Sequence, residues 1–323
     1  ALDLGVTLHL DSLDELEAVR AEHDAAPPAQ PWRIVLRVHP GPEALGGSRF
    51  GIDVENGDLK TAVDQLRELS GVRLVGLHGH ICPPKRTPDV YAALTTYLLK
   101  VGRTHLQPEE FETLNIGGGF FSAMPPEMAR QWSTPIPTFE AYGAAVGEVL
   151  RGADLGGAKP KLLLEPGISV VADAVQFVCR VVATKQVGGR AVAIASGSVY
   201  DIKPSKARAN LPLAVFHPLE GEGDGADQSW EISGFTCMED DVMFRGYDGR
   251  LAVGDLLVFG NVGAYTNVLR PPFIEPASAM IALEEGSTGE VWLGEVLRRA
   301  QTVDEIFESY TLETPPTALP ASR

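Results

Sequence analysis

The chain is poor in cysteine and lacks long apolar runs. Its three cysteines, Cys82, Cys179 and Cys237, are far apart and form no Cys-x-x-Cys pair. This pattern excludes a disulfide framework, indicates no metal site and favours a reducing, cytoplasmic setting. No apolar run approaches the roughly 20 residues that a membrane-spanning helix needs. We therefore expect a soluble protein without a membrane partner.

Basic and aromatic residues are also scarce. Lysine and arginine number 27 against 43 acidic residues, which gives a net charge of -16, and aromatic residues make up 7% of the chain. A protein of this charge repels a phosphate backbone, so nucleic acid is excluded as an expected partner. The 323 residues, 44% of them hydrophobic, suffice for two domains or for one large barrel with an appended part.

Short apolar runs alternate with amphipathic stretches through residues 1–170. The runs predict strands at 6–10, 32–38, 72–81, 111–120 and 160–166, and the stretches predict helices at 13–23, 58–69, 90–102 and 139–152. Near-continuous apolar strands are typical of a parallel sheet. We predict an α/β fold, the greater part of a (β/α)8 TIM-type barrel, with about three βα units preceding this sequence.

A different pattern begins at about residue 171 and continues to 323. Apolar runs separated by Gly-, Asp- and Pro-rich turns predict strands at 170–187, 190–196, 211–216, 229–237 and 251–260. They indicate a mostly antiparallel β-domain. Helical spacing over 291–310, with a capping pair at Thr302 and Glu305, predicts a C-terminal helix.

Three predicted strand ends in the first half carry residues suited to chemistry. His78 and His80 end the third strand, where an imidazole can stack on an aromatic cofactor or be a buried histidine bonded to the backbone. The glycines at 117–119 follow the fourth strand and suit either phosphate binding or a tight structural turn. Glu165 ends the fifth and can pair with a protonated pyridine nitrogen or with a neighbouring basic side chain.

The second half offers a thiol and a phenol. Cys237 is followed by Glu239, Asp240 and Asp241. Carboxylates beside a thiol disfavour the thiolate, so this cysteine suits proton donation, although solvated turn carboxylates are the alternative for the acidic group. Tyr265 follows a predicted strand, where its hydroxyl contacts either a phosphate or the protein core.

The order and spacing of these motifs resemble the pyridoxal-phosphate-dependent decarboxylases of the alanine-racemase-like barrel class (fold type III), which includes ornithine and diaminopimelate decarboxylases. The resemblance runs from residue 1 to about residue 310. It rests on LDSLDELEAV, RVHP…SRFG, HGHI, the glycine triplet, EPG, the Cys-x-x-x-Asp loop and GAY. It implies a barrel with a β-domain, pyridoxal 5'-phosphate as cofactor, an amino acid substrate and a homodimer with shared active sites.

The resemblance also implies a role for each candidate. His80 stacks on the pyridine ring, and Glu165 keeps the ring nitrogen protonated. Cys237 donates a proton to the substrate carbanion and Asp241 contacts a distal substrate group, both from the partner subunit. The implied cofactor-binding residues are His80, Gly118, Gly119, Glu165, Gly167 and Tyr265.

The sequence departs from the family pattern at several positions. The family's Schiff-base lysine lies on the first barrel strand, and we expect it upstream of residue 1. Pro83 and Ile168 stand where the family has a serine and an arginine that contact the phosphate. Met238 stands where diaminopimelate decarboxylases have a glutamate. The last change argues against diaminopimelate as the substrate.

Three basic residues suggest a less common substrate. Lys203, Lys206 and Arg208 are candidate ligands for additional carboxylates, such as those of a siderophore or antibiotic precursor, and simple solvent exposure is the alternative. Two other functions remain open. One is an amino acid racemase on the same scaffold, against which the Cys-x-x-x-Asp loop argues, and the other is a catalytically inactive binding protein.

Overall fold

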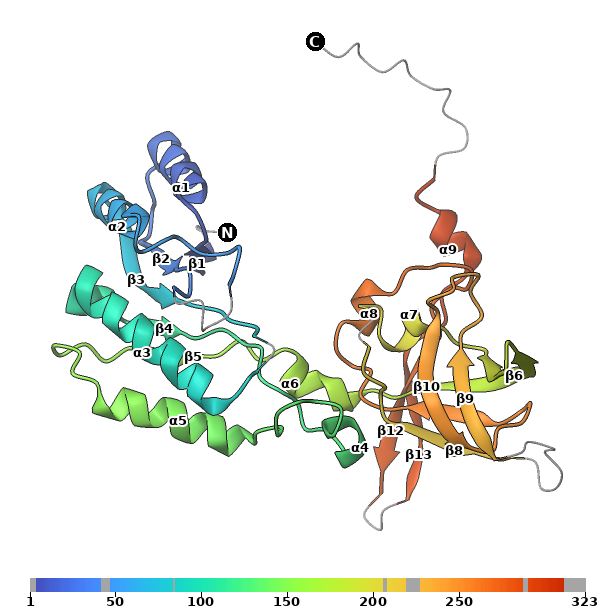
Figure 1. Ribbon diagram of the computed structural model, residues 1–323. Helices are drawn as coiled ribbons and strands as arrows, with labels where there is room; N and C mark the ends of the chain where they lie inside the picture. The colour runs from blue at the N-terminus through green and yellow to red at the C-terminus, as the bar shows by residue number, and fades with distance from the viewer. Residues whose placement is uncertain are drawn as a thin grey trace. The chain divides into compact units, whose positions relative to one another are not determined.

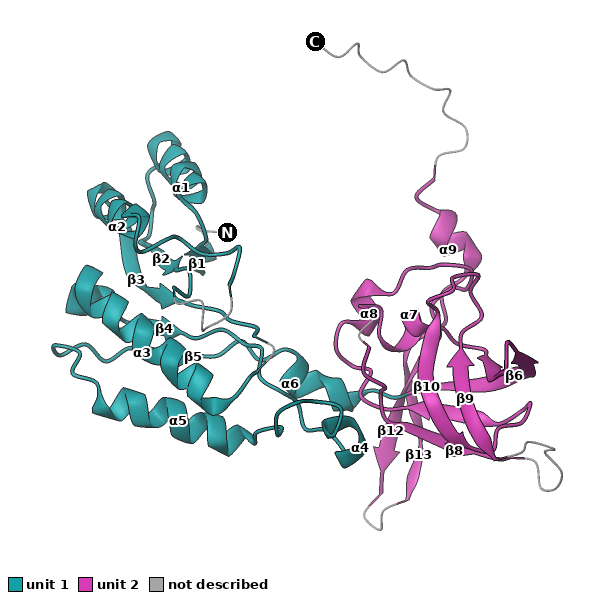
Figure 2. Cartoon of the chain, in the orientation of Figure 1, with its two compact units in different colours: residues 1–176 teal, residues 177–323 magenta. Residues whose placement is uncertain are grey.

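The computed structural model describes residues 4–41, 47–83, 85–205, 208–218, 227–286 and 290–310. The chain divides into two compact units, residues 1–176 and 177–323 (Figure 2). The boundary predicted at residue 171 falls at the end of a short helix, α6 (Ile168–Val171), which a 3-10 turn (Ala172–Ala174) follows. Residues 170–176, which the sequence predicted as the start of a strand, therefore lie outside the sheet.

Unit 1 is built on a five-stranded parallel sheet whose strand order follows the chain. The strands are β1 (Thr7–Leu10), β2 (Trp32–Arg37), β3 (Val72–His78), β4 (Thr113–Asn115) and β5 (Lys161–Leu163). The longer helices between them are α1 (Leu13–Ala25), α2 (Asp58–Glu68), α3 (Pro88–His105) and α5 (Phe139–Gly152) (Figure 1). Two short elements complete the unit, a 3-10 turn (Pro108–Glu110) and α4 (Pro126–Ala129).

Parallel strands in chain order need crossovers, and right-handed crossovers put all the connecting helices on the same face of the sheet. This repeated strand and helix pattern is that of a β/α barrel, as the sequence predicted.

Local sequence explains where these helices begin and what they bury. The Ser12 hydroxyl caps α1 by accepting from the backbone N–H of Glu15 at 3.3 Å, and Thr138 caps α5 in the same way. Such caps stabilise a helix by about 1 kcal/mol each. Leu59 and Leu66 of α2 are completely or almost completely buried. Each such leucine stabilises the fold by about 1.5–3 kcal/mol.

The register of the parallel strands aligns the residues that end them. Arg37 of β2 pairs with His78 of β3, and His78 pairs with Asn115 of β4. Asn115 in turn pairs with Leu163 of β5. The carboxyl ends of four neighbouring strand segments therefore meet along one edge of the sheet, where a β/α barrel carries its active site.

Unit 2 is a β-domain. Its six-stranded sheet has the order β10-β9-β7-β6-β11-β8, and β12 and β13 form a separate pair. Only β7 and β9 run parallel among the strand pairs of the described part of this unit. The strands are β6 (Phe177–Val187), β7 (Arg190–Ala195), β8 (Leu213–Phe216), β9 (Gln228–Ser233), β10 (Val242–Gly249), β11 (Leu256–Phe259), β12 (Met280–Glu285) and β13 (Val291–Arg298).

The predicted C-terminal helix is wrong over its first half. Residues Val291–Arg298 form β13, which pairs antiparallel with β12, and only α9 (Val303–Phe307) is helical. Apolar residues in this stretch satisfy both a helical and an extended spacing, and the partner strand β12 decides between them. The capping box at Thr302 and Glu305 is confirmed, with both reciprocal hydrogen bonds present.

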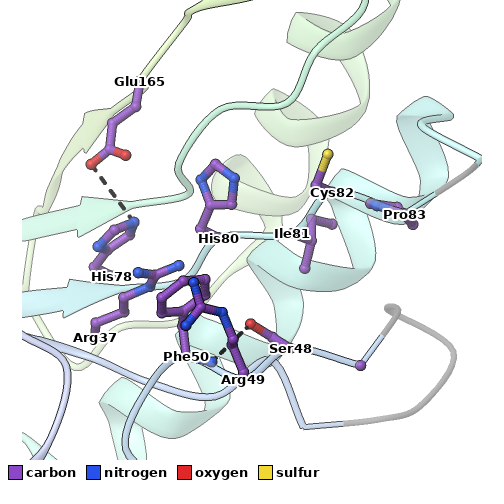
Figure 3. A pocket seen from close by; sticks show the side chains of 11 residues that line it. Arg37, Ser48, Arg49, Phe50, His78, His80, Ile81, Cys82, Pro83 and Glu165 are labelled. Carbon is purple, nitrogen blue, oxygen red and sulfur yellow. Dashed lines mark hydrogen bonds and ion pairs between the residues drawn. The ribbon is translucent and has the colours of Figure 1, made fainter. Parts of the chain in front are cut away.

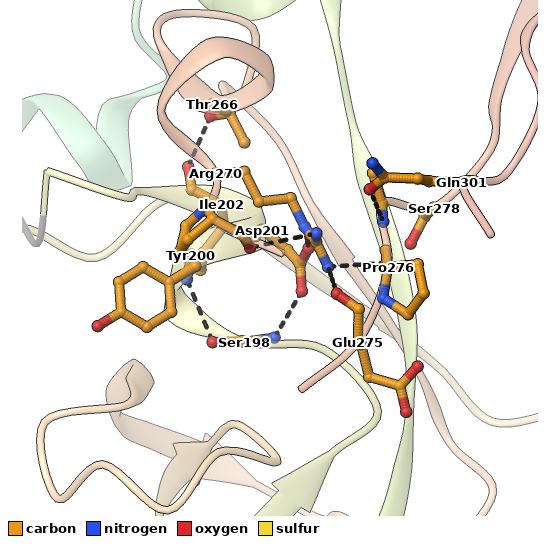
Figure 4. Close-up of polar contacts among 12 residues, drawn as sticks. Ser198, Tyr200, Asp201, Ile202, Thr266, Arg270, Glu275, Pro276, Ser278 and Gln301 are labelled. Carbon is orange, nitrogen blue, oxygen red and sulfur yellow. Dashed lines mark hydrogen bonds and ion pairs between the residues drawn. The ribbon is translucent and has the colours of Figure 1, made fainter. Parts of the chain in front are cut away.

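A buried ion pair joins two short helices of unit 2, α7 (Val199–Ile202) and α8 (Thr266–Leu269). The Nε of Arg270 donates to Asp201, and its Nη2 donates to the carbonyl oxygens of Glu275 and Pro276 at 3.1 and 3.0 Å (Figure 4). Both charged side chains are at most a tenth exposed. Losing either partner would leave a buried charge uncompensated.

In the described part of the chain, no helix is both long enough and apolar enough to cross a bilayer.

Candidate active site

A cavity of about 690 Å³ opens at the carboxyl ends of the unit 1 strands. Figure 3 shows the carboxylate of Glu165 directed at the ring of His78, with His80 nearby. The lining residues are Arg37, Gly47, Ser48, Arg49, Phe50, His78, His80, Ile81, Cys82, Pro83 and Glu165. The cavity thus gathers three of the side chains that the sequence singled out.

The glycine triplet packs directly against His80, one of the two histidines that line this cavity. The N–H of Gly118 donates to Nδ1 of His80 at 3.2 Å, which fixes the orientation of the ring. A Cβ at Gly117 would lie 2.5 Å from the same nitrogen, and a Cβ at Gly118 would lie 2.0 Å from the carbonyl oxygen of Glu165. Neither contact is possible, so the approach of these segments requires glycine.

Asn115 holds the glycine turn and Glu165 in place together. Its amide nitrogen donates to Oε1 of Glu165 at 2.7 Å, and its Oδ1 accepts from the N–H of Gly117 at 2.8 Å. The backbone N–H of Glu165 donates to the carbonyl of Gly117 at 2.7 Å. The carboxylate itself is 46% exposed, so it is oriented by the protein while remaining accessible to a ligand.

Asn115 was not among the residues predicted from the sequence. A polar residue ending an otherwise apolar strand, directly before the glycines, was the signal available for it.

His78 lies deeper than His80 and faces a second histidine. Its Nδ1 is 3.2 Å from Nδ1 of His9, and the two rings meet edge to face with centroids 5.1 Å apart. Burial lowers the pKa of His78 from 6.5 to about 4, against the opposing attraction of Glu165. Burial also lowers the pKa of His9 and of His80. The three imidazoles are therefore neutral at pH 7 and can accept a hydrogen bond or a cation.

Arg37 brings a positive charge to the cavity wall. It forms an ion pair with Asp11 at 3.2 Å, and its guanidinium carbon lies 4.6 Å from the centre of the Phe50 ring. Asp11 also accepts from the N–H of Gly51 at 3.0 Å. These contacts join the RVHP and SRFG segments, whose residues were part of the family resemblance but received no role of their own in the sequence analysis.

Asp241 occupies a different setting, inside unit 2. Its side chain is almost completely buried and its two oxygens accept four hydrogen bonds. The donors are Ser198 Oγ at 3.0 Å, Val199 N at 2.7 Å, Thr236 N at 3.0 Å and Thr236 Oγ1 at 2.7 Å. A carboxylate has about four acceptor positions. Asp241 therefore braces its own loop, and its predicted contact with substrate stays a prediction.

The other predicted residues of unit 2 differ in exposure. Cys237 is exposed, and Tyr265 is 57% exposed with a left-handed backbone at φ 64°. Lys203 is buried, its Nζ donates to the carbonyl of Ala209 at 3.0 Å, and burial lowers its pKa to about 8. Arg208 is exposed.

The two remaining predicted residues are Lys206 and Gly167. Lys206 lies outside the described residues. Gly167 lies in unit 1, exposed at the start of α6, and a Cβ there would meet no atom within 4 Å. The cofactor roles predicted for Gly167 and Tyr265, and the substrate roles predicted for Lys203 and Arg208, stay predictions.

Several known proteins similar to this chain are pyridoxal-dependent decarboxylases. Residues 1–172 match the model for the pyridoxal-dependent decarboxylase family, pyridoxal binding domain. The diaminopimelate decarboxylase of Pseudomonas aeruginosa is 28% identical over 97% of this chain and 72% of its own length. That of Bacillus subtilis is 26% identical over 78% of this chain, and the match spans 60% of the Bacillus protein.

Solved structures show the same fold. The crystal structure of diaminopimelate decarboxylase from Helicobacter pylori complexed with L-lysine superposes with a TM-score of 0.76 at 18% identity, covering 94% of this chain and 72% of the other. The enzyme from M. jannaschi gives 0.77 at 21% identity, covering 96% and 70%. Since the family model matches more than half of the sequence, the chain belongs to the pyridoxal-dependent decarboxylase family, whose cofactor is pyridoxal 5'-phosphate.

Proposed function

We propose that unit 1 binds pyridoxal phosphate in the cavity at its strand ends and that the protein decarboxylates an amino acid there. The convergence of Glu165, His80 and Gly118 carries this proposal. Their segments are separated by tens of residues in the sequence, yet the Gly118 N–H donates to His80 and a Cβ at Gly118 would collide with the backbone of Glu165.

The residues present suit the cofactor. The 690 Å³ cavity is large enough for a ligand of this size. Glu165 offers an oriented carboxylate to a protonated pyridine nitrogen, and the flat ring of His80 offers a stacking surface. The backbone at Gly118 and Gly119 carries no Cβ, so a phosphate can approach it closely. The guanidinium of Arg37, paired with Asp11, lines the same cavity.

Each of these residues has a separate task. When bound, the cofactor supplies the electron-withdrawing ring that accepts the electrons of the bond to the departing carboxylate. Glu165 keeps the proton on the ring nitrogen, because a carboxylate within hydrogen-bond reach stabilises the charged ring. Asn115 holds Glu165 in position by donating to Oε1. Cys237 is the proposed proton donor to the substrate carbon, and its exposure in unit 2 leaves the thiol accessible.

The names of the relatives favour diaminopimelate as the first substrate to test. From the sequence we predicted a different amino acid, because Met238 stands beside Cys237 in place of a glutamate. That prediction has no support from the comparisons, and it is kept as the alternative. Met238 is 42% exposed, so it is available to contact a substrate.

A test uses the full-length protein with added pyridoxal phosphate and a panel of carboxyl-labelled amino acids that includes diaminopimelate. Release of labelled carbon dioxide, lowered on the order of 100-fold by Glu165→Gln, is the expected result. Glu148→Gln, an exposed substitution in α5, is the matched control. Racemisation without carbon dioxide release, or activity unchanged by Glu165→Gln, would reject the proposal.

The proposed homodimer rests on the family resemblance and has a direct test. Mixed dimers of Glu165→Gln and Cys237→Ala chains should recover activity, because one of the two sites then combines an intact Glu165 with the partner's intact Cys237. About a quarter of the wild-type rate is expected from random mixing, by simple counting of subunits. Failure of the mixture to exceed either variant alone would place both residues in one subunit.

A further inference from the structure

His9, His78 and Glu165 form a cluster that the proposed cofactor chemistry does not use as a whole. His9 lies on β1, His78 ends β3 and Glu165 follows β5. One side-chain nitrogen or oxygen of each lies within 4.8 Å of those of the other two. The cofactor proposal requires only Glu165 from this set, so the two histidines need a separate explanation.

The innermost nitrogen of the cluster has no partner. Nε2 of His78 is buried and makes no hydrogen bond in the described structure, although the other ring nitrogen faces His9. It lies 3.7 Å from Oε1 of Glu165, too far for a hydrogen bond. A buried polar atom without a partner costs about 1–3 kcal/mol. This atom therefore points at a position where a ligand would stabilise it.

The donor set matches a transition-metal ion. Two imidazoles and one carboxylate are the protein ligands of one class of zinc site, in which water completes the shell. Around a tetrahedral zinc ion with bonds of about 2.0–2.1 Å, ligand atoms lie roughly 3.4 Å apart. The 3.7 Å separation of His78 and Glu165 is close to that spacing, and the ligand atom of His9 lies within 4.8 Å of the other two.

Neighbouring charges permit a cation at this position. Arg37 is a positive group near both histidines, and its charge is offset by the ion pair with Asp11 at 3.2 Å. Glu165 itself contributes one negative charge. The Asn115 amide that donates to its Oε1 is neutral, so it leaves this charge in place. The cluster also lies at the cavity, because His78 and Glu165 both line it, which gives an ion a path from solvent.

We propose that His9, His78 and Glu165 bind a divalent transition-metal ion of the zinc type, with water as the remaining ligand. The sequence predicted no metal site, because it contains no cysteine pair and no motif marks His9. Glu165 is also the proposed partner of the cofactor ring, so metal and pyridoxal phosphate would compete for it. This competition rests on the proposed function, whereas the metal site does not.

Zinc binding is measured by isothermal titration on the untagged, cofactor-free protein. One equivalent of Zn²⁺ should bind, and His9→Ala should weaken it on the order of 100-fold, at least as much as losing a second-shell contact. Replacing zinc by Co²⁺ gives a visible absorption band that reports four-coordinate binding. His9→Asn keeps a polar side chain facing His78. A loss of zinc affinity that this variant shares with His9→Ala is therefore not due only to misfolding.

Controls separate this site from adventitious binding. His105→Ala and Cys82→Ser remove potential ligands outside the cluster and should leave zinc affinity unchanged. Binding with no defined stoichiometry, or binding unaffected by both His9 variants, would overturn the metal site.

The competition has its own readout. Pyridoxal phosphate binding, followed by absorbance, should weaken as zinc is added to the wild-type protein and should be insensitive to zinc in His9→Ala. Cofactor binding in His9→Ala that still responds to zinc would overturn the competition. If neither protein binds pyridoxal phosphate, only the proposed function is rejected. The metal site is still tested, because zinc affinity is measured without the cofactor.

Discussion

Removing the carboxylate of Asp241 should destabilise unit 2. The side chain holds the turn before α7 to the loop after β9 through the donors Ser198, Val199 and Thr236. Asp241→Ala leaves one buried and one partly buried backbone N–H group without acceptors, at about 1–3 kcal/mol each. The two hydroxyls can rotate towards other acceptors and add little. We expect a loss of about 3 kcal/mol in the free energy of unfolding.

The assay is urea unfolding followed by tryptophan fluorescence, to which Trp230, buried in β9, contributes for unit 2. A loss of about 3 kcal/mol lowers the urea midpoint by roughly 1–3 M for an m-value of about 1–3 kcal/mol/M. Asp241→Asn should not restore stability, because its NH₂ group faces a backbone N–H at whichever oxygen position it occupies. Glu239→Ala, an exposed change in the same loop, should stay within about 0.5 kcal/mol of wild type.

A second substitution tests the same packing from the opposite side. A Cβ at Gly234 would lie 2.3 Å from Oδ2 of Asp241, so Gly234→Ala should destabilise the wild-type protein more than it destabilises Asp241→Ala. If Asp241→Ala unfolded within 1 kcal/mol of wild type and instead raised KM for the amino acid substrate, the bracing role would be refuted. The predicted substrate contact would then be correct.

Three further results are expected. Gly118→Ala should abolish cofactor binding or folding, because its Cβ would lie 2.0 Å from a backbone carbonyl oxygen. Gly143→Ala in α5, where no atom lies within 4 Å of the added Cβ, should instead stabilise the helix by up to about 1 kcal/mol. Circular dichroism and cofactor titration would check both variants. Arg270→Met should cost about 3–5 kcal/mol in thermal or urea unfolding, because it leaves the carboxylate of Asp201 buried and unpaired, and an unchanged midpoint would contradict this. Because burial lowers the pKa of His78 from 6.5 to about 4, the unfolded chain takes up a proton first as pH falls. Metal-free unit 1 should keep its full stability above pH 6.5 and lose up to about 3 kcal/mol from this group towards pH 4. His78→Gln should reduce this slope in urea titrations without abolishing it, because burial also lowers the pKa of His9 and His80.

The sequence by itself determined the barrel-type half of the fold. Strands in unit 1 are apolar along their whole length and the helices between them are amphipathic, so local pattern and tertiary environment agree. The helix over 291–298 was predicted wrongly because valine and leucine residues there fit either periodicity. Their conformation is set by antiparallel pairing with β12. The spacing of apolar residues within 291–298 does not reveal that partner strand.

The sequence also singled out His80, the glycine triplet and Glu165 as candidates, because each lies at the end of a recognisable strand. Only the tertiary structure decided which other residues meet them. Asn115 and His9 join the site because parallel register and hydrogen bonding bring different strands to one edge, and no local pattern encodes that meeting. The same holds for Asp241, whose position in the sequence suggests a binding residue and whose buried oxygens are already occupied by four donors. A side chain's type is written in the sequence, but the partners that fix its charge and hydrogen bonds are assembled by folding.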